Sequence, residues 1–238
     1  VLFKNPNGAI ASVGTHDSDF IALTGNTERL RITSAGRVSV GNLASPDGNL
    51  HVHNSSAGSV TAASDANELV LESAANVGMS FLTANDQLAR IKFGDPDATN
   101  AGIIIYSHAD DSFRFQHTSS EKMRLDSSGR LLIGTTTEGH AAGDNLTVAD
   151  SGNAGITIRS GTSNNGVIYF SDGTSGSAEY KGAVQYNHTD NYLRFYTNGA
   201  EKLRIASDGV ITAQKSATFG NTSDSFTAVQ ITASTTGI

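Results

Sequence analysis

The stretch ERLRITSAG, at residues 28–36, is the first of three copies of one cassette, which recurs as EKMRLDSSG at 121–129 and as EKLRIASDG at 201–209. The shared pattern is Glu, a basic residue, an apolar residue, Arg, an apolar residue, any residue, Ser, any residue and Gly. Internal repeats determine the architecture of a chain, so they are sought before other signals. The three cassettes therefore allow the remaining segments of the chain to be aligned with one another.

Each cassette predicts a β-hairpin with one apolar face. Apolar and polar residues alternate with period two, as Leu30 and Ile32 do around Arg31, which is typical of a strand buried on one side. Ser-x-Gly then ends the strand, and the glycine is expected to supply the positive φ of a short loop. We predict this φ for Gly36, Gly129 and Gly209. The inward-facing residues are predicted to be Phe113, Phe115, Met123, Leu125, Leu131 and Ile133, with Leu193, Phe195, Leu203, Ile205 and Ile211 one repeat further on, whereas Lys122 and Arg124 face away.

The similarity extends upstream of the cassette. IKFGD at 91–95 matches IYFSD at 168–172, and GIIIYSH at 102–108 matches GAVQYNH at 182–188. The spacing from Asp172 to Tyr186 is three residues longer than that from Asp95 to Tyr106, which indicates an insertion in the turn around Gly176. The alignment predicts a partial first repeat (1–43), a second repeat (44–137), a third repeat (138–213) and the start of a further unit or a C-terminal segment (214–238).

Short alternating segments complete an all-β prediction. Residues 50–52 and 146–148 are expected to be strands that open the later repeats. The segment 65–75 contains helix-favouring residues, but Leu69 and Leu71 alternate around Val70, so we predict a strand there. By alignment a strand is also expected at 154–159. No stretch predicts a convincing helix.

Composition restricts the possible functions. The 238 residues include 25 Gly, 3 Pro, no Cys and no Trp, which suits many short strands joined by tight turns. Without cysteine there is no disulfide framework and no thiolate metal site. The net charge of −7 argues against a nucleic-acid-binding surface, and no apolar run approaches the ~20 residues of a membrane span. The first residue is Val, so we expect a processed product or a piece of a longer chain.

Strands that are apolar on one face must have that face covered. One solution is a solenoid of stacked repeats, although repeats of about 80 residues are long for the usual 20–50-residue unit. The other is several parallel chains that wrap one axis and cover each other's sheets. The sparse aliphatic faces favour the second solution, so the predicted fold is an elongated homotrimeric, β-prism-like fibre made of repeated β-hairpin and meander units.

The cassette, the following IGT element at 133–135 and the stretch YNHTDNYLRFYTNG at 186–199 together resemble repeats in bacteriophage tail fibres, over about residues 16–213. The resemblance implies a homotrimeric segment of an extracellular fibre on the virion tail, joined to other fibre or tail proteins. Such a fibre attaches to a host surface glycan or receptor, without catalysis, cofactors, nucleic acid or membrane insertion. The alternatives are a polysaccharide-degrading tailspike and a trimeric adhesin of the same build on a bacterial surface.

The repeated charges are expected to be structural. Three steps along a regular strand place Glu and Arg on opposite faces, so each should pair with a neighbouring strand or chain rather than with the other. Solvated hairpin charge is the alternative, and it contributes little to stability. The pairs concerned are Glu28 and Arg31, Glu121 and Arg124, and Glu201 and Arg204.

Other chemistry-bearing residues have plainer explanations. His51 and His53 have the spacing of two metal ligands on one strand face, and three chains would supply six histidine nitrogens. Because Leu50 and Val52 form the apolar face, the histidines are expected to point outward. Metal binding by these two residues is left open. His16, His108 and His188 recur at one place in the repeat and are expected to have a turn or hydrogen-bond role. The aspartates Asp95, Asp97, Asp110 and Asp111 are turn residues rather than a glycosidase pair. Tyr169, Tyr180, Tyr192 and Tyr196 are candidate sugar contacts.

Overall fold

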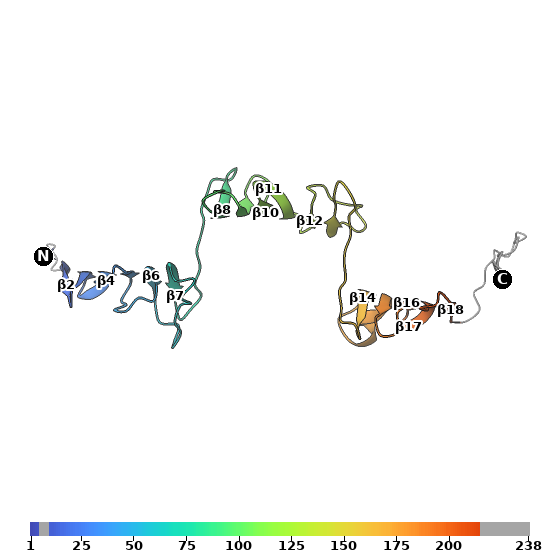
Figure 1. Ribbon diagram of the computed structural model, residues 1–238. Helices are drawn as coiled ribbons and strands as arrows, with labels where there is room; N and C mark the ends of the chain where they lie inside the picture. The colour runs from blue at the N-terminus through green and yellow to red at the C-terminus, as the bar shows by residue number, and fades with distance from the viewer. Residues whose placement is uncertain (5–9, 215–238) are drawn as a thin grey trace, which may run out of the picture. The chain divides into compact units, whose positions relative to one another are not determined.

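The computed structural model describes residues 1–4 and 10–214, and it confirms the all-β prediction (Figure 1). The described residues form three β-sheets and contain no α-helix. No helix in this part of the chain is long and apolar enough to cross a membrane. The further unit predicted from residue 214 lies, apart from Gln214, outside the described residues.

The first sheet contains seven strands in sequence order. Neighbouring strands from β1 to β5 are antiparallel, whereas β5–β6 and β6–β7 are parallel pairs. Its strands are β1 (Leu2–Lys4), β2 (Ile10–His16), β3 (Asp19–Thr24), β4 (Thr27–Ile32), β5 (Val38–Val40), β6 (Leu50–His53) and β7 (Leu69–Glu72).

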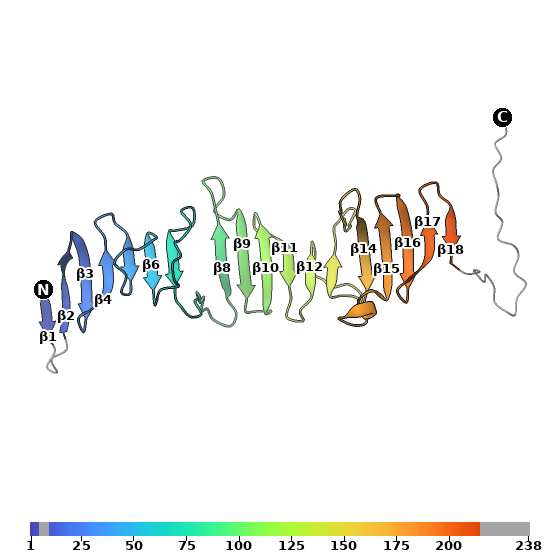
Figure 2. The same ribbon diagram turned by 90° about the horizontal axis from the view of Figure 1, so that it is seen from below.

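The second sheet has six strands and the third has five, again with sequence neighbours side by side (Figure 2). The second contains β8 (Leu88–Phe93), β9 (Gly102–Ser107), β10 (Ser112–His117), β11 (Ser120–Leu125), β12 (Leu131–Ile133) and β13 (Leu146–Val148), with β13 parallel to β12. The third contains β14 (Asn165–Phe170), β15 (Gly182–Asn187), β16 (Tyr192–Thr197), β17 (Ala200–Ile205) and β18 (Ile211–Ala213). The predicted insertion forms a short 3₁₀ helix, η1 (Gly176–Tyr180), between β14 and β15.

The predicted conformation of the cassette glycines is confirmed. The φ angles of Gly36, Gly129 and Gly209 are 85°, 78° and 85°. In the first copy the N–H of Gly36 donates to the carbonyl of Thr33, which closes the loop. In the third copy Gly209 donates to Ala206 in the same way. The positive φ of these glycines thus allows the chain to reverse its direction at the end of each cassette.

Three of the four additional strand predictions are confirmed and one is wrong. Residues 50–53, 69–72 and 146–148 are strands, whereas 154–159 form none. In the latter segment the side chain of Ile158 packs against β14 instead. Its Cγ2 lies 3.5 Å from the position that a Cβ would take at Gly166. The repeat boundaries predicted near 44 and 138 fall in the crossover segments before β6 and β13, and as sequence boundaries they stay predictions.

Candidate functional site

One face of the first sheet is apolar and open. Strand register places Ile32 opposite Val38 and Val38 opposite Leu50, so their side chains share a face. Ile32 and Leu50 are each 39% exposed, although they lie within strands. The same face carries further half-exposed residues: Phe20, Val40, Val52 and Leu69. The described part of the chain therefore leaves an apolar surface where a sheet normally has its core.

The third sheet repeats this arrangement. Its register aligns Leu193, Ile205 and Ile211 in one row and Phe195, Leu203 and Ala213 in the next, which confirms that the predicted inward-facing residues of this sheet share a face. Ile156 and Ile158 approach this face but leave an open hollow of about 280 Å³. In the second sheet the corresponding residues Phe113, Phe115, Leu125 and Ile133 are 37–49% exposed.

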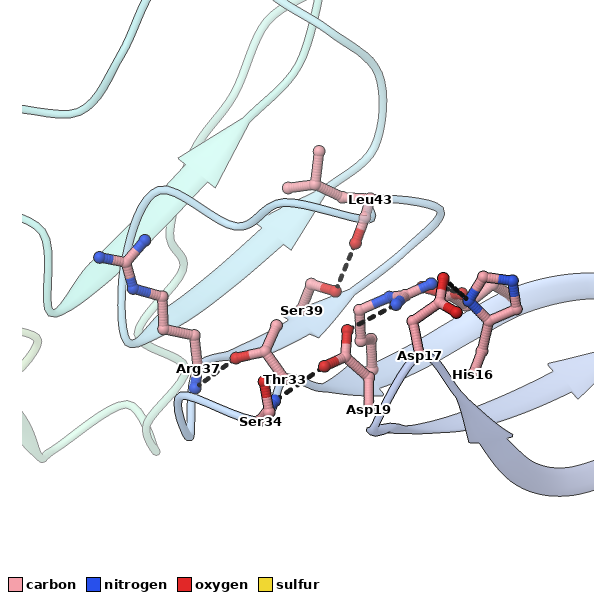
Figure 3. A network of polar contacts seen from close by, with 10 residues as sticks. His16, Asp17, Asp19, Thr33, Ser34, Arg37, Ser39 and Leu43 are labelled. Atoms are coloured by element: carbon pink, nitrogen blue, oxygen red, sulfur yellow. Dashed lines mark hydrogen bonds and ion pairs between the residues drawn. The ribbon is translucent and has the colours of Figure 1, made fainter.

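The opposite face of the first sheet is covered by the chain itself. A parallel strand pair needs a crossover, and the segment 41–49 between β5 and β6 supplies it. Ser39 Oγ donates to the carbonyl of Leu43 at 2.9 Å, as Figure 3 shows. The N–H of Asp47 donates to His51 Nδ1 at 3.3 Å. Because the crossover lies over this face, Ser39 and His51 are 0% and 1% exposed.

A β-bulge in the cassette overturns the expectation that its Glu and Arg lie on opposite faces. In the first sheet Ala22 pairs with Leu30 but Leu23 pairs with Glu28, so Arg29 is an extra residue. In the third sheet Phe195 pairs with Leu203 and Tyr196 with Glu201, which leaves Lys202 extra. One inserted residue shifts the alternation by one step. Glu and Arg three residues apart therefore face the same side.

The bulge is held by the same hydrogen bond in all three copies. The carbonyl of the extra residue accepts from the N–H just beyond the following strand. The three bonds run from Gly41 to Arg29, from Gly134 to Lys122 and from Gln214 to Lys202, at 2.9, 3.0 and 2.9 Å. Because the contact uses only backbone atoms, it can form in each copy whatever the side chain at this position.

The bulge lets Glu28 and Arg31 form a two-point ion pair. Arg31 donates from Nε to Glu28 Oε1 at 2.8 Å and from Nη2 to Glu28 Oε2 at 2.6 Å. Its Nη1 donates to Asp19 Oδ2 at 2.7 Å, and Asp19 Oδ1 accepts from the N–H of Ser34 at 2.8 Å (Figure 3). The hydrogen bonds to Glu28 and Asp19 raise the pKa of Arg31, and those from Arg31 and Ser34 lower the pKa of Asp19. The network ties β4 to β3 and to the hairpin loop.

The other sheets carry related networks on the same face. Arg204 donates from Nε and Nη2 to the two carboxylate oxygens of Glu201 at 2.9 and 2.8 Å, and these bonds lower the pKa of Glu201. Arg194 Nη1 also reaches Glu201, at 3.4 Å. In the second sheet Arg114 contacts Asp110 and lies 3.7 Å from Glu121, and neither Glu121 nor Arg124 is without a partner. The cassette charges in the first and third copies are thus structural ion pairs within a sheet.

The prediction that His51 points outward is wrong. Both histidines lie opposite Leu50 and Val52, as expected, but the crossover segment buries His51 there. Its Nε2 lies 3.0 Å from Glu72 Oε2. A hydrogen bond from the N–H of Ala57 is the main reason why the pKa of Glu72 is lowered. Among the described residues, no group of three or more His, Asp or Glu side chains is arranged to hold a metal ion.

Local contacts account for several of the remaining candidates. His108 and His188 follow β9 and β15 directly and pack edge-on against Tyr106 and Tyr186, with ring centroids 4.8 and 4.9 Å apart. Asp95 Oδ1 accepts from the N–H groups of Asp97 and Ala98 at 3.0 and 2.7 Å, which caps the turn after β8. Asp95 therefore stabilises a turn, whereas the two histidines pack against tyrosines of the preceding strands.

The sequence comparisons add no relative. The chain matches no protein-family model and no curated protein sequence.

Proposed function

We propose that this chain is a structural segment of a homotrimeric fibre that takes part in host attachment and has no catalytic role. The observation that carries the proposal is the open apolar face of each sheet, opposite a face covered by crossovers and ion pairs. Contiguous apolar surface of this kind marks an interface in soluble proteins. Burying it contributes about 25 cal/mol per Å².

A second copy of the same chain is the occupant that best fits these faces. In all three sheets the faces combine aliphatic residues with phenylalanine and contain no tryptophan, which suits a narrow core shared around an axis. With three copies, each sheet becomes one side of a prism whose apolar faces meet and whose ion-paired faces look outward. The resemblance of the cassette and the 186–199 stretch to tail-fibre repeats supports three copies rather than two, and it supports a place on a virion tail with other tail proteins as partners.

Two related functions remain as alternatives to this proposal. A bacterial surface adhesin of the same build would use the same apolar faces, so it differs from a tail fibre only in where it is displayed. The polysaccharide-degrading tailspike would require two carboxylates across a sugar-binding cleft. No contact described above favours that arrangement, because Asp95 caps a turn, Asp110 pairs with Arg114 and Asp111 accepts from the Tyr106 hydroxyl.

Native mass spectrometry of the purified chain tests the proposal. We expect a mass about three times the 24.7 kDa of one chain, stable to dilution because the core is shared. A stable monomer at micromolar concentration would contradict the proposal. A dimer would indicate two sheets packed face to face instead of a prism.

A further inference from the structure

The ion-paired face of the third sheet contains a hollow that none of the contacts above explains. Its volume is about 270 Å³, and it opens between strands β14, β15 and β16 and the helix η1. It is lined by Tyr169, Tyr180, Ala183, Gln185, Tyr196 and Gly199. The hollow is therefore walled by three tyrosines over a floor of small residues.

Strand register and the insertion bring the three tyrosines together. Tyr169 pairs with Ala183, and Ala183 pairs with Tyr196, so two rings flank one small residue in a single row. The insertion that forms η1 adds Tyr180, whose ring lies 3.6 Å from where a Cβ would stand at Gly199. Tyr169 and Tyr180 are 59% and 45% exposed, so their rings are accessible from solvent.

The side-chain amide of Gln185 offers the hollow a hydrogen-bond donor. Gln185 is 7% exposed, and its Oε1 accepts from Arg194 Nε at 2.7 Å. This bond fixes the orientation of the amide. The described part of the chain provides no partner for the amide nitrogen, whose two N–H groups are left to donate to a ligand. Among the described residues this nitrogen is not one of the buried atoms that lack a partner, so it stays accessible to a ligand that enters the hollow.

The surrounding charges disfavour an ionic ligand. The guanidinium carbon of Arg194 lies 5.0 Å from the centroid of the Tyr196 ring, so a bound cation would be repelled there. Both Arg194 and Arg204 are already paired with Glu201, which reduces their attraction for an anion. A neutral ligand with one apolar face and polar groups at its rim fits better, because tyrosine rings combine an apolar body with a polar tip.

We propose that this hollow binds one neutral pyranose ring of a glycan. The C–H face of such a ring is apolar and can pack on a tyrosine, while its hydroxyl oxygens accept from the Gln185 amide. The proposal gives the host-attachment function proposed above a ligand class and a location, and it rests on that function only for the origin of the glycan.

Saturation-transfer NMR on the full chain tests the proposal, with methyl pyranosides of glucose, galactose and mannose as probes and tetramethylammonium as the competing cation. We expect saturation of the C–H protons of at least one pyranoside and none of tetramethylammonium. Tyr196→Ala should weaken that binding by about tenfold or more, because it removes one wall. Ala183→Ile should do the same by filling the floor, and isoleucine is tolerated at the corresponding Ile103 of the second sheet.

The matched control is Gln116→Ala, which alters the second-sheet counterpart of Tyr196 and should leave pyranoside binding unchanged. Absence of saturation for every pyranoside, saturation of tetramethylammonium alone, or unchanged binding in Ala183→Ile would each overturn the proposal. The native mass of the same samples separates the two proposals. A trimer that binds no pyranoside contradicts only the sugar site, whereas a monomer that binds one contradicts only the trimeric fibre.

Discussion

The second and third sheets share a strand order and a cassette, yet their two faces have diverged to different degrees. On the apolar face, Phe115 corresponds to Phe195, Leu125 to Ile205 and Phe113 to Leu193, so the residues stay apolar although their sizes differ. On the opposite face, Ile105 corresponds to Gln185 and Gln116 to Tyr196. Ile105 is 2% exposed, whereas the third sheet has an open hollow in this region. The apolar face therefore keeps its polarity between the two sheets, whereas the polarity of the opposite face changes.

The difference follows from what each face must satisfy. A shared apolar core has to match the neighbouring copies, so each substitution would act three times in the proposed trimer. On the opposite face the polar side chains find their hydrogen-bond and ion-pair partners within the same chain. A substitution there can therefore be compensated by neighbouring residues of the same sheet. Arg114 and Arg194 illustrate this, since both reach the cassette glutamate, but Arg114 also pairs with Asp110 whereas Arg194 donates to Gln185. Assembly thus restricts one face, while the other can acquire a separate role.

The largest effect is expected when a charge is introduced on the apolar face. Leu125→Asp and its counterpart Ile205→Asp should each abolish the trimer, because three unpaired carboxylates would be buried close together. The exposed bulge residues provide the controls, and Lys122→Asp and Lys202→Asp should assemble normally. Light scattering after gel filtration gives the oligomeric state. Equal assembly of all four variants would show that the apolar face is not the interface.

A smaller effect is expected in the cassette loops, which both sheets share. Gly129→Val and Gly209→Val should each lower the free energy of unfolding by more than about 1 kcal/mol, because a β-branched residue fits positive φ poorly. A Cβ at either position meets no atom within 4 Å, so the cost arises from the backbone alone. Gly129→Asn is the control and should cost less, since Asn tolerates this region. Thermal unfolding measures the difference, and equal melting temperatures for Val and Asn would exclude this explanation.

The smallest effect concerns the carboxylate of Asp110, which contacts Arg114 in the second sheet. Burial alone would raise the pKa of Asp110, but hydrogen bonds from Ser107, Ser112 and Arg114 outweigh it and hold the pKa at about 2. Because this value is below the ~3.9 of an unfolded aspartate, the group stabilises the fold above about pH 4. That contribution is lost as the pH falls from about 4 to about 2.

Asp110→Asn should therefore reduce the pH dependence of the melting temperature in that range. Asp190→Asn, its third-sheet counterpart, is the control and should have little effect, because Arg194 pairs with Glu201 instead. Carbon-detected NMR titration of the Asp110 carboxyl gives its pKa directly. A titration midpoint near 4 would mean that the contact with Arg114 does not persist in solution.

Features that depend on local chemistry could be predicted from the amino-acid sequence. Period-two alternation identified strands in all three sheets, because side chains of a strand point alternately to its two faces. The Ser-x-Gly pattern identified the cassette loops and the positive φ of their glycines, because only the conformational range of one residue is involved. The shared apolar face of Leu193, Phe195, Leu203, Ile205 and Ile211 followed from the same alternation.

Features that depend on a neighbouring strand or segment could not be predicted in this way and became visible in the folded chain. The pairing of Glu28 with Arg31 requires a bulge, which exists only relative to the register of the partner strand β3. The burial of His51 requires a crossover segment on a particular face, and alternation along β6 carries no information about it. The tyrosine hollow joins residues from three strands and an inserted helix. Such contacts are non-local, so the pattern within one strand cannot specify them.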